Sequence, residues 1–138
     1  MKNLFGLAFK RLWENLSSKQ TGLSFRQRKT AAERLGVWVD SKEFCRSDQC
    51  MADVAEELGV SKDELSWMCH LVYGESFQSV RKRLRIKEAI RLMCEFPSVP
   101  LTLIAERVGI GDKSNFRRQF YEVYGHTIME WRESSGRG

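Results

Sequence analysis

Apolar side chains along this chain return every three or four positions, with polar side chains between them. This spacing places the apolar residues on one side of an α-helix. The strict alternation of a half-buried β-strand does not extend over a strand's length anywhere. The two prolines, Pro97 and Pro100, indicate a break between two helices. The pattern therefore predicts an all-α protein.

The second half of the chain contains a repeat. Residues 54–60 match residues 104–110 at an offset of 50. Beyond these segments the offset becomes 51, because the second copy carries one more turn residue, and Gly111 is suited to absorb it. Each copy predicts a short helix, a tight turn and a second helix, which is the helix-turn-helix arrangement. Two copies in register favour this interpretation much more than a single match would.

Residue types at the two turns agree with this arrangement. Gly59 and Gly109 follow the first helices, where a left-handed residue ends a helix at low cost. Ser61 and Glu64 form a predicted capping box at the start of the next helix. Asp112 is the corresponding cap in the second copy. We therefore expect the second helices to begin just after residues 61 and 112.

The second helix of each copy divides into an apolar face and a polar face. The apolar faces consist of Leu65, Met68, Cys69 and Val72 in the first copy and Phe116, Phe120 and Val123 in the second. The candidate DNA-binding residues are Lys62, Asp63, Ser66 and Trp67 in the first copy and Lys113, Ser114, Arg117 and Arg118 in the second. Outward positions of such helices can reach base edges in a major groove. Residues 62–73 and 113–124 are thus the candidate recognition helices.

The repeat divides the chain into six expected segments. These are an amphipathic helix and join (1–22), a helical run-in (23–50), the first helix-turn-helix (51–76), a long linker helix (77–97), the second helix-turn-helix with a closing helix (98–133), and a disordered tail (134–138). Within the run-in we expect one helix through Leu35 and a short second helix around residues 37–44. Trp38 and Phe44 are its expected core anchors.

The N-terminal helix of residues 1–22 is basic and amphipathic. Its apolar stripe consists of Phe5, Phe9, Leu12 and Leu16, and its basic residues are Lys2, Lys10 and Arg11. Such a helix can pack on its own domain, form a homodimer, cover another partner or lie on an anionic membrane. Packing on its own domain is the favoured interpretation, and membrane contact is not expected.

Composition limits the class of protein. The 138 residues are 42% hydrophobic, which excludes disorder over most of the chain, and they carry a formal net charge of +5. No apolar run approaches the roughly 18 residues of a membrane span, and no secretory signal is recognisable. The four cysteines are expected to be reduced thiols, mostly buried. We therefore expect a cytoplasmic protein.

No catalytic, metal or cofactor site is expected. The chain has no phosphate-binding glycine loop and no credible pair of a nucleophile with a base. A zinc site formed by Cys45, Cys50, Cys69 and His70 is the weak alternative, because the gap between the first two cysteines is too long for most zinc sites. An enzyme is accordingly not predicted.

Residues 51–133 resemble the DNA-binding domain of the AraC family of bacterial transcription regulators. The matching residues are Asp53-Val54-Ala55, Leu58-Gly59, Ser61, Leu65-Ser66, Gly74, Phe77, Leu84-Arg85-Ile86, Ala89, Leu92, Ile104-Ala105, Val108-Gly109, Asp112, Ser114, Phe116, Arg118, Phe120, Gly125 and Trp131-Arg132. The resemblance implies two helix-turn-helix subdomains joined by a linker helix, with recognition helices entering successive major grooves of double-stranded DNA. It also implies that Arg118 reads a base.

Several residues depart from the family pattern. Trp67 replaces a common arginine, Cys69 and Ile110 replace phenylalanine, and Ile128 replaces proline. The apolar replacements should leave folding intact, whereas Trp67 removes a cation from the first polar face.

The first helix-turn-helix is acidic. Residues 51–76 carry six carboxylates and one lysine, a net charge of −5, which is the wrong sign for phosphate binding. The alternative function is therefore a protein-interaction module. It would bind RNA polymerase or a second regulator through its N-terminal helix and acidic first unit.

Overall fold

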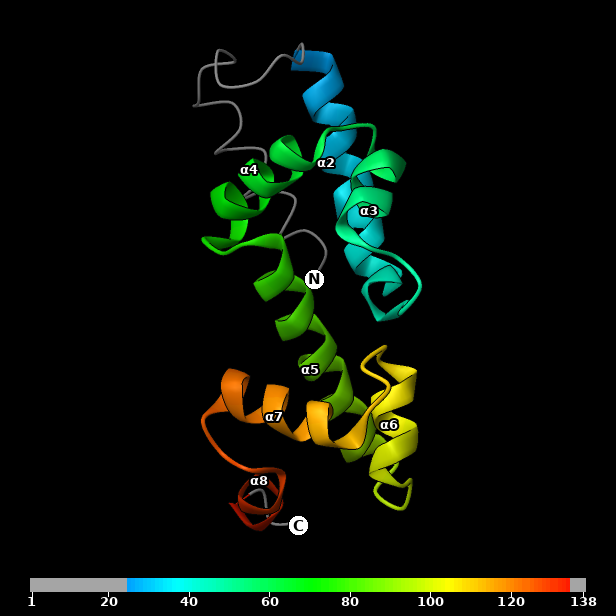
Figure 1. Ribbon diagram of the computed structural model, residues 1–138, viewed down its shortest axis with the longest axis vertical. Coiled ribbons are helices and arrows are strands. Elements are labelled where there is room, and N and C mark those ends of the chain that lie inside the picture. The colour runs from blue at the N-terminus through cyan, green and yellow to red at the C-terminus, as the bar shows by residue number, and fades with distance from the viewer. Residues whose placement is uncertain (1–24, 135–138) are drawn as a thin grey trace. The chain divides into compact units, whose positions relative to one another are not determined.

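The computed structural model describes residues 25–134, which form helices joined by short connections (Figure 1). In chain order these are α2 (Phe25–Asp40), the 3-10 helix η2 (Glu43–Cys45), α3 (Met51–Leu58), α4 (Lys62–Tyr73), α5 (Phe77–Glu95), α6 (Leu101–Arg107), α7 (Lys113–Tyr124) and α8 (Ile128–Ser134). No strand occurs among the described residues, in agreement with the all-α prediction. The helix predicted within residues 1–22 lies outside them, as does the predicted tail beyond Ser134.

The described residues divide into two compact units. The first unit contains residues 25–43 and 48–80, and the second contains residues 44–47 and 81–134. Helix α5 contributes its first four residues to the first unit and the others to the second. Each unit holds one helix-turn-helix, formed by α3 and α4 in the first unit and by α6 and α7 in the second.

Trp38 of α2 lies in the core of the first unit. Its side chain is 3% exposed, which confirms the prediction that it is buried. Its ring lies 5.6 Å from the ring of Phe77, centroid to centroid, with the planes tilted by 41°. The other buried residues of this core are Ala31, Leu35, Val54, Ala55, Leu58, Leu65, Met68, Cys69 and Val80. Helix α2 thus packs against α3.

The expected break between two helices in the run-in is wrong. Helix α2 continues through Gly36 to Asp40, and only the 3-10 helix η2 follows it. Ala31, Leu35 and Trp38 are buried along one continuous face, so burial is maintained across the glycine. A glycine inside a helix costs only about 1 kcal/mol relative to alanine, which the burial of two large side chains exceeds.

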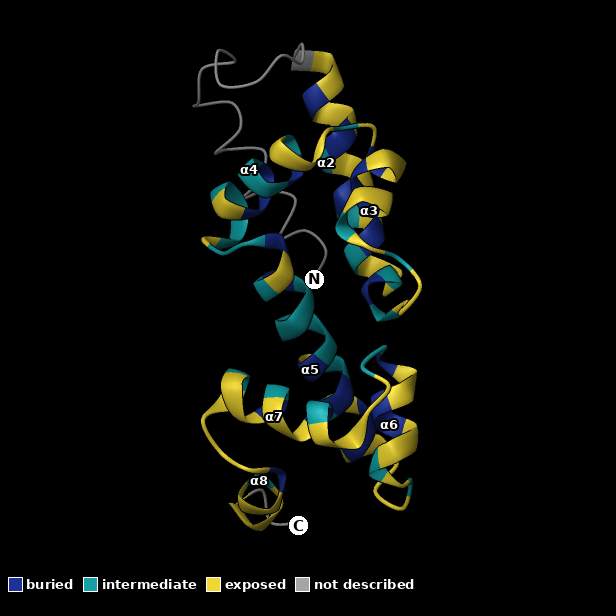
Figure 2. Cartoon of the chain, in the orientation of Figure 1, coloured by how far each residue is buried: buried dark blue, intermediate teal, exposed yellow. Residues whose placement is uncertain are grey.

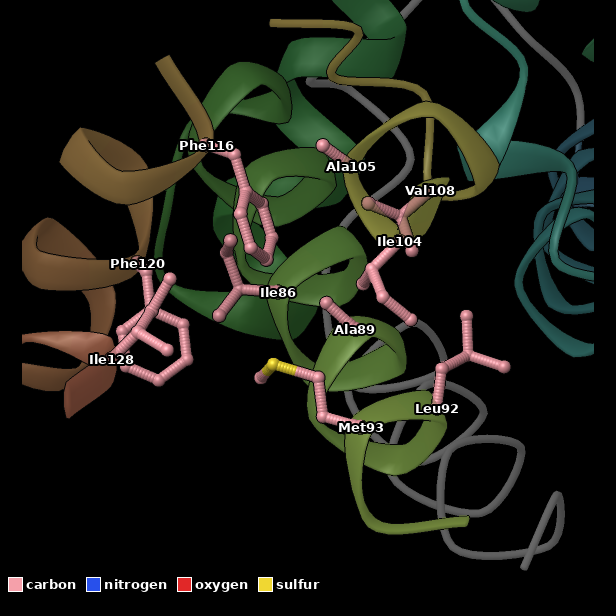
Figure 3. Packing of buried hydrophobic residues seen from close by; sticks show 10 residues of the cluster. All are labelled: Ile86, Ala89, Leu92, Met93, Ile104, Ala105, Val108, Phe116, Phe120 and Ile128. Atoms are coloured by element: carbon pink, nitrogen blue, oxygen red, sulfur yellow. The ribbon is translucent and has the colours of Figure 1, made fainter. Parts of the chain in front are cut away.

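The core of the second unit joins four helices (Figure 3). Its buried residues are Ile86, Ala89, Leu92 and Met93 of α5, Ile104 and Ala105 of α6 with Val108 beyond it, Phe116 and Phe120 of α7, and Ile128 of α8. In Figure 3, Phe116 points from α7 toward Ile86 of α5. The rings of Phe120 and Trp131 meet edge to face at 6.2 Å, which holds α8 against α7. Ile110 packs against this core, so two departures from the family pattern, Ile110 and Ile128, are accommodated.

Residues 44–47, which we call the entry segment, pack in the second unit although the chain on both sides of them belongs to the first. Arg85 of α5 holds the segment by donating from Nε to the carbonyl oxygen of Phe44 at 2.6 Å and from Nη2 to that of Arg46 at 2.8 Å. Burial lowers the pKa of the Arg85 guanidinium to about 10, so it stays charged at pH 7. Phe44 is itself buried, which confirms its predicted place in a core.

Candidate nucleic-acid interface

The second helix-turn-helix depends on two glycines in its turn. Gly109 has a φ of +89° and Gly111 a φ of +83°, the left-handed region that favours glycine. A Cβ atom on Gly109 would lie 2.3 Å from the carbonyl oxygen of Cys45 in the entry segment, whereas one on Gly111 would meet nothing. Gly111 thus absorbs the additional turn residue, as predicted. Asp112 then caps α7, its side chain accepting a hydrogen bond from the backbone N–H of Ser114 at 3.3 Å.

The first helix-turn-helix has the predicted capping box. The backbone N–H of Ser61 donates to Glu64 Oε1 at 2.8 Å, and the N–H of Glu64 donates to Ser61 Oγ at 3.1 Å. At the start of α3, Asp53 accepts a hydrogen bond from the backbone N–H of Cys50 at 3.1 Å. Two of the six carboxylates in residues 51–76 therefore serve helix ends, where negative charge is stabilising.

Helix α7 separates its faces as the sequence predicted. Phe116 and Phe120 are fully buried, and Val123 is half-buried. The four candidate DNA-binding residues of this helix, Lys113, Ser114, Arg117 and Arg118, are all exposed. Figure 2 shows this outer side of α7 as largely exposed ribbon. The face therefore offers three cations and a hydroxyl to a partner.

The side chain of Arg118 is held by neighbours that sequence reasoning missed. Nη1 donates to Glu122 Oε2 at 3.0 Å, and Nη2 donates to Asn115 Oδ1. Glu122 also forms a second ion pair, in which its Oε1 accepts a hydrogen bond from Lys82 Nζ of α5 at 3.0 Å. The spacing of Arg118 and Glu122, four residues apart on a helix, was a readable signal for the first of these pairs. In the part of the chain that the structure describes, no ion pair engages Arg117.

The corresponding face of α4 is less open. Lys62 and Asp63 are exposed, whereas Ser66 and Trp67 are half-buried. Only part of the indole is thus available to a partner.

The acidic residues of the first unit differ in their surroundings. Glu56 of α3 and Asp63 of α4 are exposed, and Glu57 accepts a hydrogen bond from Gln49 Nε2 at 2.8 Å. Exposed carboxylates repel phosphate, so these side chains oppose contact between the first unit and a phosphate backbone.

The described residues contain no group of three or more side chains placed to hold a metal ion. Among the four cysteines only Cys69 is buried, so the prediction that most of them are buried is wrong, and burial raises the pKa of the Cys69 thiol to about 12. None of the helices between residues 25 and 134 is long and apolar enough to cross a membrane.

Comparisons with known proteins agree with this geometry. Solved structures similar to the chain include the C-terminal domains of two response regulators. The C-terminal domain of AraT, a response regulator from Geobacillus stearothermophilus, has a TM-score of 0.65 and 29% identity, over 83% of this chain and 88% of that one. The C-terminal domain of the two-component response regulator yesN from Fusobacterium nucleatum has a TM-score of 0.64 and 25% identity, over 74% of this chain and 97% of that one. No curated protein matches.

A family-level comparison covers more than half of the chain. Residues 54–134 match the family described as "Helix-turn-helix domain", which is the AraC-type DNA-binding domain. The match begins within α3 and continues through α4, α5, α6 and α7 to the end of α8. This family consists of transcription regulators that are not enzymes. The chain therefore belongs to the AraC-type helix-turn-helix family of DNA-binding domains.

Proposed function

We propose that this chain binds double-stranded DNA sequence-specifically, as a bacterial AraC-type transcription regulator, with α4 and α7 in major grooves. The observation that carries the proposal is the outer face of α7. It exposes Lys113, Ser114, Arg117 and Arg118 while the opposite face is locked into the core. A rigid helix with donors at successive outward positions is the arrangement that reads base edges.

The residues of α7 differ in the contacts that they suit. Arginine donates two parallel hydrogen bonds to guanine O6 and N7, so Arg118 is the proposed base-reading residue and Arg117 its neighbour. Lys113 and Ser114 lie in the first turn of α7 and suit contacts with the phosphate backbone. These contacts would fix the position of the helix in the groove.

In the first unit, α4 would contribute Lys62, Asp63, Ser66 and Trp67. Trp67 can touch a thymine methyl group or a sugar, and Lys62 can meet a phosphate. The acidic surroundings oppose both contacts. We therefore propose unequal binding, in which α7 provides most of the affinity and sequence discrimination.

The exposed carboxylates of the first unit favour a second candidate function, contact with another protein. Glu56 and Asp63 are exposed on neighbouring helices of one helix-turn-helix. An acidic surface of this kind complements a basic patch on RNA polymerase or on a second regulator. Both functions would use the first unit, since Asp63 lies on α4, but DNA binding would depend mainly on α7 of the second unit.

Selection from a pool of random duplexes tests the proposed function. The wild-type chain should enrich one sequence pattern, and the double variant Arg117→Ala/Arg118→Ala should lose that enrichment. Arg132→Ala on α8 is the matched control, because it removes an exposed arginine outside the recognition helices. If wild type enriches no pattern, or if the double variant selects as the control does, the proposal is wrong.

A further inference from the structure

The guanidinium of Arg118 is restrained although its side chain is 60% exposed. Both terminal nitrogens donate to residues of the same helix, one to Glu122 and one to Asn115. An exposed arginine without partners samples many rotamers and loses that freedom when it binds. These two hydrogen bonds reduce the rotamers that Arg118 can sample before any partner arrives.

Glu122 is fixed in turn by a different helix. Each of its two oxygens accepts a hydrogen bond from a different cation. Oε2 accepts from Arg118 and Oε1 accepts from Lys82 of α5, each at 3.0 Å. The hydrogen bond from Lys82 lowers the pKa of the Glu122 carboxyl, and Arg118 lowers it further, so Glu122 is ionised at neutral pH. The Glu122 carboxylate therefore connects Arg118 to α5, the helix that shares a core with α7.

These hydrogen bonds leave Arg118 able to recognise a base. A guanidinium has five N–H groups, two on each terminal nitrogen and one on Nε. Glu122 and Asn115 each occupy one N–H group, on different terminal nitrogens. One N–H group stays available on each of those nitrogens, and a bidentate contact with guanine needs two.

We propose that Glu122, anchored by Lys82, is a positioning residue that fixes Arg118 for reading guanine and reduces the attraction of α7 for phosphate in general. The inference rests on the proposed function, since it assumes that Arg118 meets a base. Glu122 itself carries the wrong sign to bind phosphate. It therefore increases selectivity and lowers affinity for unrelated sequences.

Dissociation constants for three kinds of duplex test this role. The probes are the duplex enriched by wild type, the same duplex with each G·C pair changed in turn to A·T, and an unrelated duplex of equal length. We expect Glu122→Gln to reduce discrimination at one G·C pair about two- to fivefold, the range of an exposed ion pair. It should also tighten binding to the unrelated duplex, because one repulsive charge is gone.

Glu95→Gln is the matched control. It removes the same charge and breaks another arginine–glutamate pair with the i, i+4 spacing, that of Arg91 and Glu95 on α5. It should leave discrimination unchanged. A purely structural role of Glu122 would instead weaken binding to all duplexes alike, and that outcome would overturn the inference.

The double variant shows whether Glu122 acts through Arg118. In an Arg118→Ala background, Glu122→Gln should no longer change discrimination, and an undiminished effect there would contradict the positioning role. If wild type enriches no sequence, the proposed function fails and the inference with it. A different outcome contradicts the inference alone. In that outcome wild type enriches a sequence and Arg118→Ala loses a G·C preference, but Glu122→Gln keeps that preference in full.

Discussion

Arg118 and Trp67 occupy equivalent positions in the two copies of the repeat, and they offer different chemistry to a base pair. The arginine presents a planar set of five donors and is 60% exposed. The tryptophan has a single N–H donor and is half-buried. The outer faces of α4 and α7 therefore differ in the hydrogen-bond donors that they can offer to a partner.

We expect Arg118→Ala to weaken specific binding much more than Trp67→Ala. A good bidentate base contact is worth about 1–3 kcal/mol, which corresponds to a loss of roughly tenfold to a hundredfold in affinity. Trp67→Ala should cost less, because only apolar contacts are lost. Affinities of both variants for the enriched duplex measure this, and equal losses would show that the first unit contributes as much as the second.

Lys113→Ala should have a different signature. If Lys113 meets phosphate, its loss weakens binding evenly across sequences and reduces the slope of log affinity against log salt by about 1. Titrations of the enriched duplex and of an unrelated duplex at several salt concentrations measure both effects. A loss confined to the enriched duplex would instead assign Lys113 to a base.

Residue-level prediction from sequence succeeded where a periodic pattern determines the outcome. The exposure of the α7 candidates follows from the burial of Phe116 and Phe120 at helical spacing. The role of Lys82 could not be foreseen, because it lies 40 positions from Glu122 and only the packing of α5 with α7 brings them together. Half-burial of Trp67 likewise depends on neighbouring elements.

At the scale of elements, the turn between α6 and α7 contains two glycines with positive φ and different surroundings. We expect Gly111→Ala to cost about 1 kcal/mol of stability, the cost of a left-handed alanine. Gly109→Ala should cost clearly more, since its Cβ would also lie 2.3 Å from a backbone oxygen that has little room to move. Urea unfolding of both variants compares them, and equal costs would show that the entry segment yields easily.

Helix ends were more predictable than helix continuity. The capping box of Ser61 and Glu64 and the cap at Asp112 are local signals, and the structure contains both. The continuation of α2 through Gly36 is not local, because it depends on the burial of Leu35 and Trp38 in the core. At Gly36 the burial of these two side chains outweighs the low helix propensity of glycine.

At the scale of the whole molecule, the sequence of residues 1–22, which lie outside the described part, predicts a further apolar stripe. If Phe5, Phe9, Leu12 and Leu16 form a partner surface, removal of residues 1–20 should leave a folded domain but change its mass in solution or its partner binding. Light scattering and DNA titration measure these quantities. Unchanged mass together with unchanged DNA affinity would exclude the partner surface.

The entry segment has a consequence for where this module can be cut. The match to the family model begins at residue 54, yet the carbonyl groups that Arg85 binds and the oxygen that lies over Gly109 come from residues 44–46. A chain trimmed to the recognisable domain would leave a half-buried guanidinium without these acceptors, in the unit that carries the proposed base-reading helix. The folded unit that contains α7 thus includes residues 44–46, and any graft of this domain onto another protein has to carry those residues with it.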